Sequence, residues 1–175
     1  MIIGTPYFYT STIREWKCLI SDNRFEEIIL SSLHYLVKNK LVQVYAFVIM
    51  PNHVHLIWEM MKMNKKETPV ASFMKFTGHQ FLDKLRAKEP STLQPYEVDW
   101  LCRKYNFWQP DSLAINLYSE QVFLQKMNYI HNNPLQEKWK LAVTPELYKY
   151  SSAKFYYTGG KENDFGFLTH YQDRT

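Results

Sequence analysis

The chain has 175 residues, of which 46% are hydrophobic and 22% charged, and this fits a single globular domain with its own core. A net charge of +4 and abundant aromatic residues fit a polyanionic partner and argue against a dedicated cationic substrate. Only two cysteines are present, Cys18 and Cys102, and their wide separation excludes a zinc ribbon and a disulfide framework.

The N-terminal stretch has no basic leader, and the sequence contains no run of about 18 apolar residues. We therefore expect neither a signal peptide nor a membrane span, and we expect a cytoplasmic protein with reduced thiols. No internal repeat and no low-complexity tract is present.

The first half of the chain predicts three strands and one helix. Residues 6–13 are β-branched and aromatic and predict a strand, whereas residues 16–20 fit a short strand or a turn. Asn23 is the expected N-cap of a helix with apolar residues at helical spacing. Residues 42–49 and 53–59 are rich in β-formers and flank a Met-Pro-Asn turn, which predicts an antiparallel pair.

Thr68 and Pro69 supply the cap and the first position of a second long helix. A third helix must end before Pro134, because proline disfavours helical geometry at Asn133. The elements predicted for the second half are a polar loop at residues 62–67, a helix from residue 68, a loop at 89–99, a strand at 105–109, a helix at 119–131 and a short helix at 145–156.

The resulting order is strand, helix, strand, strand, helix, strand, helix. Strand pairs separated by helices predict an α+β sandwich, in which helices pack against a mainly antiparallel sheet. We assign residues 1–158 to this single domain and residues 159–175 to a C-terminal tail, whose Gly-Gly start and polar end are typical of a disordered segment.

His53 and His55 give the clearest chemical signal in the sequence. Alternate residues of a strand project from the same face about 6.6 Å apart, so both imidazoles can converge on one divalent ion. The plainer interpretation is a surface strand that carries two histidines. The flanking residues are apolar, however, and polar rings in an apolar environment cost free energy unless they bind a partner. Magnesium, manganese and zinc all suit such a pair, and the spacing does not choose among them.

Tyr129 lies in a second concentration of polar residues, at the end of the third predicted helix. Val122, Gln125 and Tyr129 share one helical face, while Phe123 and Ile130 lie on the face expected to enter the core. A neutral phenol is a poor nucleophile at pH 7, so a nucleophilic Tyr129 would need a cation beside it. Because the chain has 13 tyrosines, an ordinary core or surface aromatic is the alternative interpretation.

Three segments together resemble single-tyrosine transposases of the HUH type. Residues 45–57, Tyr-Ala-Phe-Val-Ile-Met-Pro-Asn-His-Val-His-Leu-Ile, are similar to the HUH motif. Phe-Trp-Gln at 107–109 and Tyr-Ile-His-Asn-Asn-Pro at 129–134 resemble later motifs of the REP-associated tyrosine transposase branch. Order and spacing agree over roughly residues 5–158, while the residues after Phe-Trp-Gln and after Asn-Pro, the latter at 135–139, depart from the branch pattern.

This resemblance implies a ferredoxin-like fold with the histidine pair on a central strand. It also implies a metal-dependent endonuclease and strand-transferase acting on single-stranded or hairpin DNA, in which Tyr129 attacks a phosphodiester and leaves a 5′-phosphotyrosine link. His53, His55 and Asn133 would hold a divalent ion, Mg²⁺ or Mn²⁺. The family contains monomers and dimers, so the sequence leaves a homodimer open.

Candidate DNA contacts are basic and aromatic residues, because lysine and arginine neutralise phosphates and aromatic rings stack on bases. The selected residues are Arg14, Lys17, Lys75, His79, Arg103, Lys104 and Trp108. The charged ones also have a plainer interpretation as solvated surface, and Trp108 as a core ring.

Two other functions stay open from the sequence alone. A DNA hairpin-binding protein that retains the fold without catalysis would bind in the presence of a chelator and form no covalent adduct. A phosphoesterase that activates water would cleave without a trapped intermediate, although the sequence lacks the carboxylate cluster that a two-metal site commonly needs.

Overall fold

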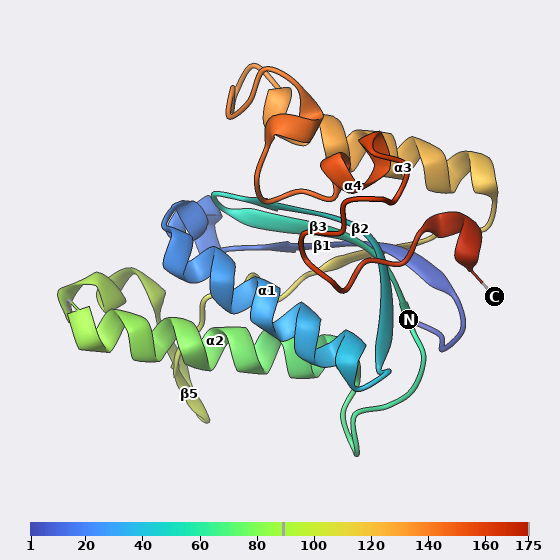
Figure 1. Cartoon of the computed structure of the whole chain (residues 1–175). Helices are drawn as coiled ribbons and strands as arrows, with labels where there is room; N and C mark the ends of the chain where they lie inside the picture. The colour runs from blue at the N-terminus through green and yellow to red at the C-terminus, as the bar shows by residue number, and fades with distance from the viewer. Residues whose placement is uncertain (89, 175) are drawn as a thin grey trace.

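A four-stranded antiparallel sheet forms the centre of the structure, a computed structural model that describes residues 1–88 and 90–174 (Figure 1). The strand order is β2-β3-β1-β6. Its strands are β1 (Pro6–Thr12), β2 (Val42–Met50), β3 (His53–Met60) and β6 (Leu113–Asn116). A separate two-stranded sheet is formed by β4 (Glu97–Trp100) and β5 (Arg103–Tyr105).

The α-helices are α1 (Asn23–Lys38), α2 (Pro69–Lys88), α3 (Glu120–Asn132) and α4 (Ala153–Tyr157). The short 3-10 helices are η1 (Arg14–Trp16), η2 (Leu19–Ser21), η3 (Pro90–Tyr96), η4 (Asn133–Leu135), η5 (Pro145–Leu147) and η6 (Tyr171–Asp173). Within residues 1–88 and 90–174, no helix is both long enough and apolar enough to cross a membrane. Cys18 and Cys102 are exposed free thiols.

The order β1-α1-β2-β3-α2-β6 is that of a ferredoxin-like sandwich, with every neighbouring strand pair antiparallel. The predicted α+β class is therefore confirmed. In Figure 1, α1 and α2 lie on one side of the sheet and α3 lies on the other. We call these two sides the α1/α2 face and the α3 face.

Both faces carry an apolar cluster, because the strands alternate their side chains between them. Val54, Leu56 and Trp58 of β3 enter the larger cluster on the α1/α2 face. Ile57 of the same strand enters the smaller cluster on the α3 face, with Phe123 of α3. Every residue of β3 is buried, as expected for a central strand covered on both sides.

The cap of α1 differs from the prediction by one residue. Asp22, rather than Asn23, is the N-cap, and its side chain accepts a hydrogen bond from the backbone N–H of Arg24. The predicted alternatives for residues 16–20 are resolved in favour of turns, since η1 and η2 lie there instead of a strand.

The fourth strand of the sheet is β6, and the strand predicted at residues 105–109 is wrong. Tyr105 is the last residue of β5, whereas Phe107 and Trp108 are buried in the core, and Trp108 forms an isolated bridge with Ile13. Their β-forming character serves packing instead of strand pairing. The loop predicted at 89–99 is η3 followed by β4, and residue 89 lies outside the described residues.

The expected C-terminal tail packs against the sheet instead of leaving it. Phe167 and Leu168 are buried, Leu168 forms a parallel bridge with Val44, and the Thr169 N–H donates to the Val44 carbonyl at 3.0 Å. The aromatic and aliphatic residues inside this polar segment provide the apolar area that holds it. The helix predicted at 145–156 is interrupted, because its middle bonds to β2 and leaves only η5 and α4 helical.

Candidate functional site

The two histidines lie side by side on the α3 face. β1 pairs with β3 so that Thr10 is opposite His55 and Thr12 is opposite His53. Both imidazoles are buried, and their ring centroids are 4.6 Å apart. The intervening Val54 faces the opposite side and belongs to the larger core.

Each imidazole is oriented by a hydrogen bond at its Nδ1 atom. His53 Nδ1 lies 2.6 Å from Asn52 Oδ1, and His55 Nδ1 lies 2.7 Å from Thr10 Oγ1. The Asn52 amide is itself fixed, because its Nδ2 donates to the Trp16 carbonyl at 3.0 Å. An amide oxygen only accepts, so Nδ1 of His53 carries the proton and Nε2 has a free lone pair.

Burial keeps both rings neutral at pH 7. It lowers the pKa of His53 to about 4. The Asn133 side chain acts to raise this pKa, and the charge of Lys138 lowers it further. Burial, together with the charges of His53 and Lys126, lowers the pKa of His55 to about 3. A cation therefore meets imidazoles that have no proton to displace.

Asn133 follows α3 directly and keeps helical geometry, with φ −57° and ψ −42°. The helix does end before Pro134 as predicted, but the expected departure of Asn133 from helical geometry is wrong. The chain continues as η4, in which the Asn133 N–H donates to the Ile130 carbonyl. This continuation places the Asn133 side chain in the protein interior, where it is buried next to His53.

The end of α3 is anchored to the sheet by a buried polar contact. His131 Nε2 lies 2.9 Å from Ser152 Oγ, and Ser152 Oγ also accepts from the Phe47 N–H of β2 at 3.0 Å. Burial lowers the pKa of His131 to about 4. The anchor fixes the helix between its two candidate site residues, Tyr129 and Asn133.

The donor set fits a divalent cation. His55 Nε2 and Asn133 Oδ1 are buried and have no hydrogen-bond partner, which is costly unless something binds them. Two neutral imidazoles and one amide oxygen are acceptable ligands for Mg²⁺, Mn²⁺ or Zn²⁺. Among residues 1–88 and 90–174, no three His, Cys, Asp or Glu side chains gather as a metal site, so the amide is the third ligand at hand.

Tyr129, on α3, lies against the ring of His55. Its ring centroid is 5.3 Å from that of His55 and 5.9 Å from that of Phe8, and 44% of the residue is exposed. The phenol is thus accessible to a large substrate and adjacent to a candidate metal ligand.

Lys126 is a charged neighbour of the phenol that the sequence reasoning missed. Its Nζ atom lies 5.9 Å from the Tyr129 ring centroid and 5.0 Å from that of Phe8. The sequence could have indicated this neighbour, because Lys126 precedes Tyr129 by three residues and residues three apart on a helix share a face.

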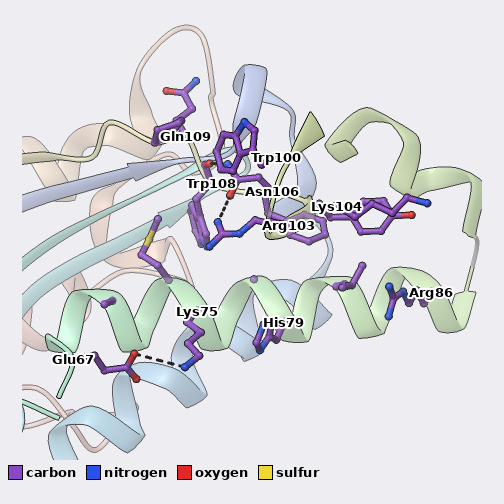
Figure 2. Close-up of a pocket in the computed structure, with 17 residues that line it drawn as sticks. Glu67, Lys75, His79, Arg86, Trp100, Arg103, Lys104, Asn106, Trp108 and Gln109 are labelled. Carbon is purple, nitrogen blue, oxygen red and sulfur yellow. Dashed lines mark hydrogen bonds and ion pairs between the residues drawn. The ribbon is translucent and has the colours of Figure 1, made fainter. Parts of the chain in front are cut away.

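Four of the six polar DNA contacts that were proposed line one groove of about 580 Å³ beside α2, and the buried Trp108 forms part of its lining (Figure 2). Lys75 and His79 lie along α2, and Arg103 and Lys104 come from the β5 side. Two carboxylates partly neutralise the positive charge of this groove, because Lys75 lies 3.8 Å from Glu67 and Lys104 lies 3.6 Å from Glu97. This groove belongs to the α2 side of the molecule, away from the α3 face.

The remaining three candidates do not join this groove as stacking or phosphate-binding groups. Arg14 and Lys17 both pair with the exposed carboxylate of Glu15. Trp108 is a correction: it is only 4% exposed, and its indole N–H donates to Thr77 Oγ1 at 2.9 Å. Its ring completes the core floor of the groove and offers no face for a base.

Comparisons with solved structures find the same fold. A REP-associated tyrosine transposase, solved bound to a REP hairpin, matches with a TM-score of 0.63 and 18% identity, over 91% of this chain and 82% of its own. A protein of Deinococcus radiodurans assigned as a transposase matches with a TM-score of 0.41 and 19% identity, over 73% and 88% of the two chains, and is too distant to support an argument. No family model and no curated protein matches the sequence. The resemblance seen in the motifs is therefore confirmed at the level of the fold.

Proposed function

We propose that the chain is a metal-dependent endonuclease and strand-transferase for single-stranded or hairpin DNA, with Tyr129 as its nucleophile. The observation that carries the proposal is the exposed Tyr129 ring against His55, beside two buried ligand atoms without partners. The fold supports a DNA substrate, since the similar transposase was solved with a REP hairpin.

In the proposed reaction the phenolic oxygen of Tyr129 attacks a phosphorus atom and displaces the 3′-oxygen. A bond forms between the phenolic oxygen and phosphorus, and the bond from phosphorus to the 3′-oxygen breaks. The phenol proton passes through solvent to the leaving 3′-oxygen, which becomes a 3′-hydroxyl. Attack by another 3′-hydroxyl reverses the step and rejoins DNA. A neutral phenol is a poor nucleophile, and the Lys126 ammonium beside the Tyr129 ring would help to stabilise the phenolic oxygen as it loses its proton.

His53, His55 and Asn133 would hold the divalent ion, Mg²⁺ or Mn²⁺. When bound, such an ion polarises the phosphoryl oxygen under attack and offsets the negative charge that develops. The chain contributes neutral imidazoles, oriented by Asn52 and Thr10, and an unpaired amide oxygen. Lysine and arginine side chains of the α2 groove would contact phosphates without reading sequence.

A denaturing gel tests the nucleophile. Protein is incubated with labelled hairpins that carry unpaired flanks, in Mn²⁺ or in chelator, and a denaturant-resistant protein–DNA band is expected only with the metal. Tyr129→Phe should abolish the band, whereas Tyr118→Phe, which changes a still more exposed tyrosine just before α3, should not. An unchanged adduct yield in Tyr129→Phe would overturn the assignment.

A second candidate is a hairpin-binding protein without catalysis. The α2 groove favours it, because basic side chains gather there independently of the histidine pair. The same hairpins distinguish the two: salt-sensitive binding that persists in chelator, with no adduct on any substrate, would support the binding protein.

A further inference from the structure

Two tryptophans border His53 on its outer side. Trp16 of η1 and Trp139, which follows η4, have ring centroids 6.5 Å and 6.0 Å from that of His53. Trp16 is 57% exposed, and Trp139 is half-buried against the cluster of the α3 face. Segments more than a hundred residues apart in the chain thus bring two indoles to one candidate metal ligand.

Lys138 links the two rings. Its Nζ atom lies 5.8 Å from the Trp16 centroid and 5.1 Å from the Trp139 centroid, within the usual range of a cation–π contact. Its charge also reaches His53, where it helps to lower the imidazole pKa. An exposed ammonium therefore lies between two aromatic faces and close to the candidate reaction centre.

The conformation that exposes Trp16 is held by the same side chain that orients His53. Glu15 and Trp16 both adopt left-handed backbone geometry, with φ of 54° and 58°, which non-glycine residues seldom do. Asn52 accepts from His53 through Oδ1 and donates to the Trp16 carbonyl through Nδ2. Because Asn52 is buried, the indole and the imidazole are fixed relative to each other.

We propose that Trp16, Trp139 and Lys138 form a stacking site for one unpaired base next to the phosphate that Tyr129 attacks. Aromatic rings combined with basic groups bind unpaired bases, and one stacked base changes affinity about 5- to 150-fold. This inference rests on the proposed function, since it places the base beside that reaction centre. Lys138 and Trp139 lie in residues 135–139, where the sequence departs from the transposase pattern.

Affinity measurements with hairpins that carry single abasic nucleotides test the proposed stacking site. Full-length protein is titrated in chelator against labelled hairpins in which each unpaired nucleotide in turn is made abasic. For the unaltered protein, one position should weaken binding by about 5- to 150-fold. In Trp16→Ala the intact and abasic forms of that substrate should bind alike, and Trp16→Tyr should restore most of the difference.

A matched control is Tyr35→Ala, which removes an exposed ring from α1 on the opposite side of the sheet. It should leave the abasic effect unchanged. The inference is overturned if every abasic position costs the same in the unaltered protein and in Trp16→Ala. It is also overturned if the sensitive nucleotide does not adjoin the phosphate that the adduct assay maps.

Adduct formation on the same hairpins separates this inference from the proposed function. Adduct without any Trp16-dependent abasic effect would overturn the stacking site and leave the nuclease standing. A Trp16-dependent effect without adduct would support base stacking and overturn the nuclease, together with the placement of the base beside a cleaved phosphate.

Discussion

On the α1/α2 face of the sheet, β3 contributes Val54, Leu56 and Trp58, which are fully buried among other apolar side chains. On the α3 face the same strand contributes two buried imidazoles, His53 and His55, and the unpartnered atoms His55 Nε2 and Asn133 Oδ1 lie there. The alternation of one strand therefore separates packing from chemistry. Truncation of apolar side chains on the α1/α2 face should lower stability at every pH. Changes on the α3 face should instead alter ligand binding, reaction and the pH dependence of stability.

Acid should produce the largest effect, and it should act through the α3 face. His53, His55 and His131 have pKa values lowered by burial to about 4, 3 and 4, whereas an unfolded histidine titrates near 6.5. Between those values the unfolded chain binds more protons, so stability falls as the pH falls below 6.5. Each histidine contributes about 1.4 kcal/mol per pH unit, or about 6 kcal/mol for all three at pH 5.

Urea titrations in chelator at pH 7 and pH 5 measure this dependence. His131→Gln should reduce the slope of unfolding free energy against pH by about a third, since it removes one of three equal contributions. His34→Gln, at an exposed position of α1, should leave the slope unchanged. A free energy of unfolding that is the same at both pH values would contradict the prediction.

Truncation on the α1/α2 face should come next in size. Leu56→Ala should lower the free energy of unfolding by about 2–5 kcal/mol, because it opens a cavity in a fully buried core. His55→Leu, the neighbouring change on the α3 face, removes an unpartnered nitrogen and should cost far less, while abolishing metal-dependent adduct. If His55→Leu lowered the free energy of unfolding at pH 7 by more than Leu56→Ala does, the α1/α2 face would not be the face whose packing stabilises the fold.

Glu26 tests the opposite pH dependence at the start of α1. Burial, followed by the charge of Asp22, raises its pKa to about 7, and Oε2 has no hydrogen-bond partner. The unfolded carboxyl ionises near 4.5, so native stability falls as the pH rises from there to about 7. Glu26→Gln should therefore gain up to about 3 kcal/mol at pH 8 and little at pH 4.5, by urea titration. The exposed neighbour change Glu27→Gln should show no such pH-dependent gain.

Removing a partner of a candidate ligand should have the smallest effect of the set. Thr10→Val deletes the hydroxyl that orients His55 and should weaken Mn²⁺ binding about 10- to 100-fold, measured by calorimetric titration. Ser11→Ala, the adjacent change facing α2, should leave Mn²⁺ affinity unaltered. Equal affinities for Thr10→Val and the unaltered protein would show that the Thr10 hydroxyl does not support Mn²⁺ binding through His55.

Periodicity predicted the long elements well, because each needs only a repeating apolar face. It failed at β6, where the exposed residues of a sheet edge carry little pattern, and at Trp108, whose β-forming character serves the core. The spacing of His53 and His55 put both imidazoles on one face of a strand without further information. Trp16 was beyond reach of any local pattern, because tertiary packing alone brings it to the histidines.

Because Asn133 continues the helical path of α3 through η4, the phenol of Tyr129 and the amide of Asn133 belong to one rigid body. A tyrosine that swung away with a tethered DNA end would take an amide ligand with it. The residence time of the cation during the covalent stage would thus report directly on helix displacement. Fast exchange of Mn²⁺ from the adduct would indicate that α3 moves away from the histidines. Slow exchange would indicate that α3 stays in place and that the DNA strands are exchanged on an immobile protein.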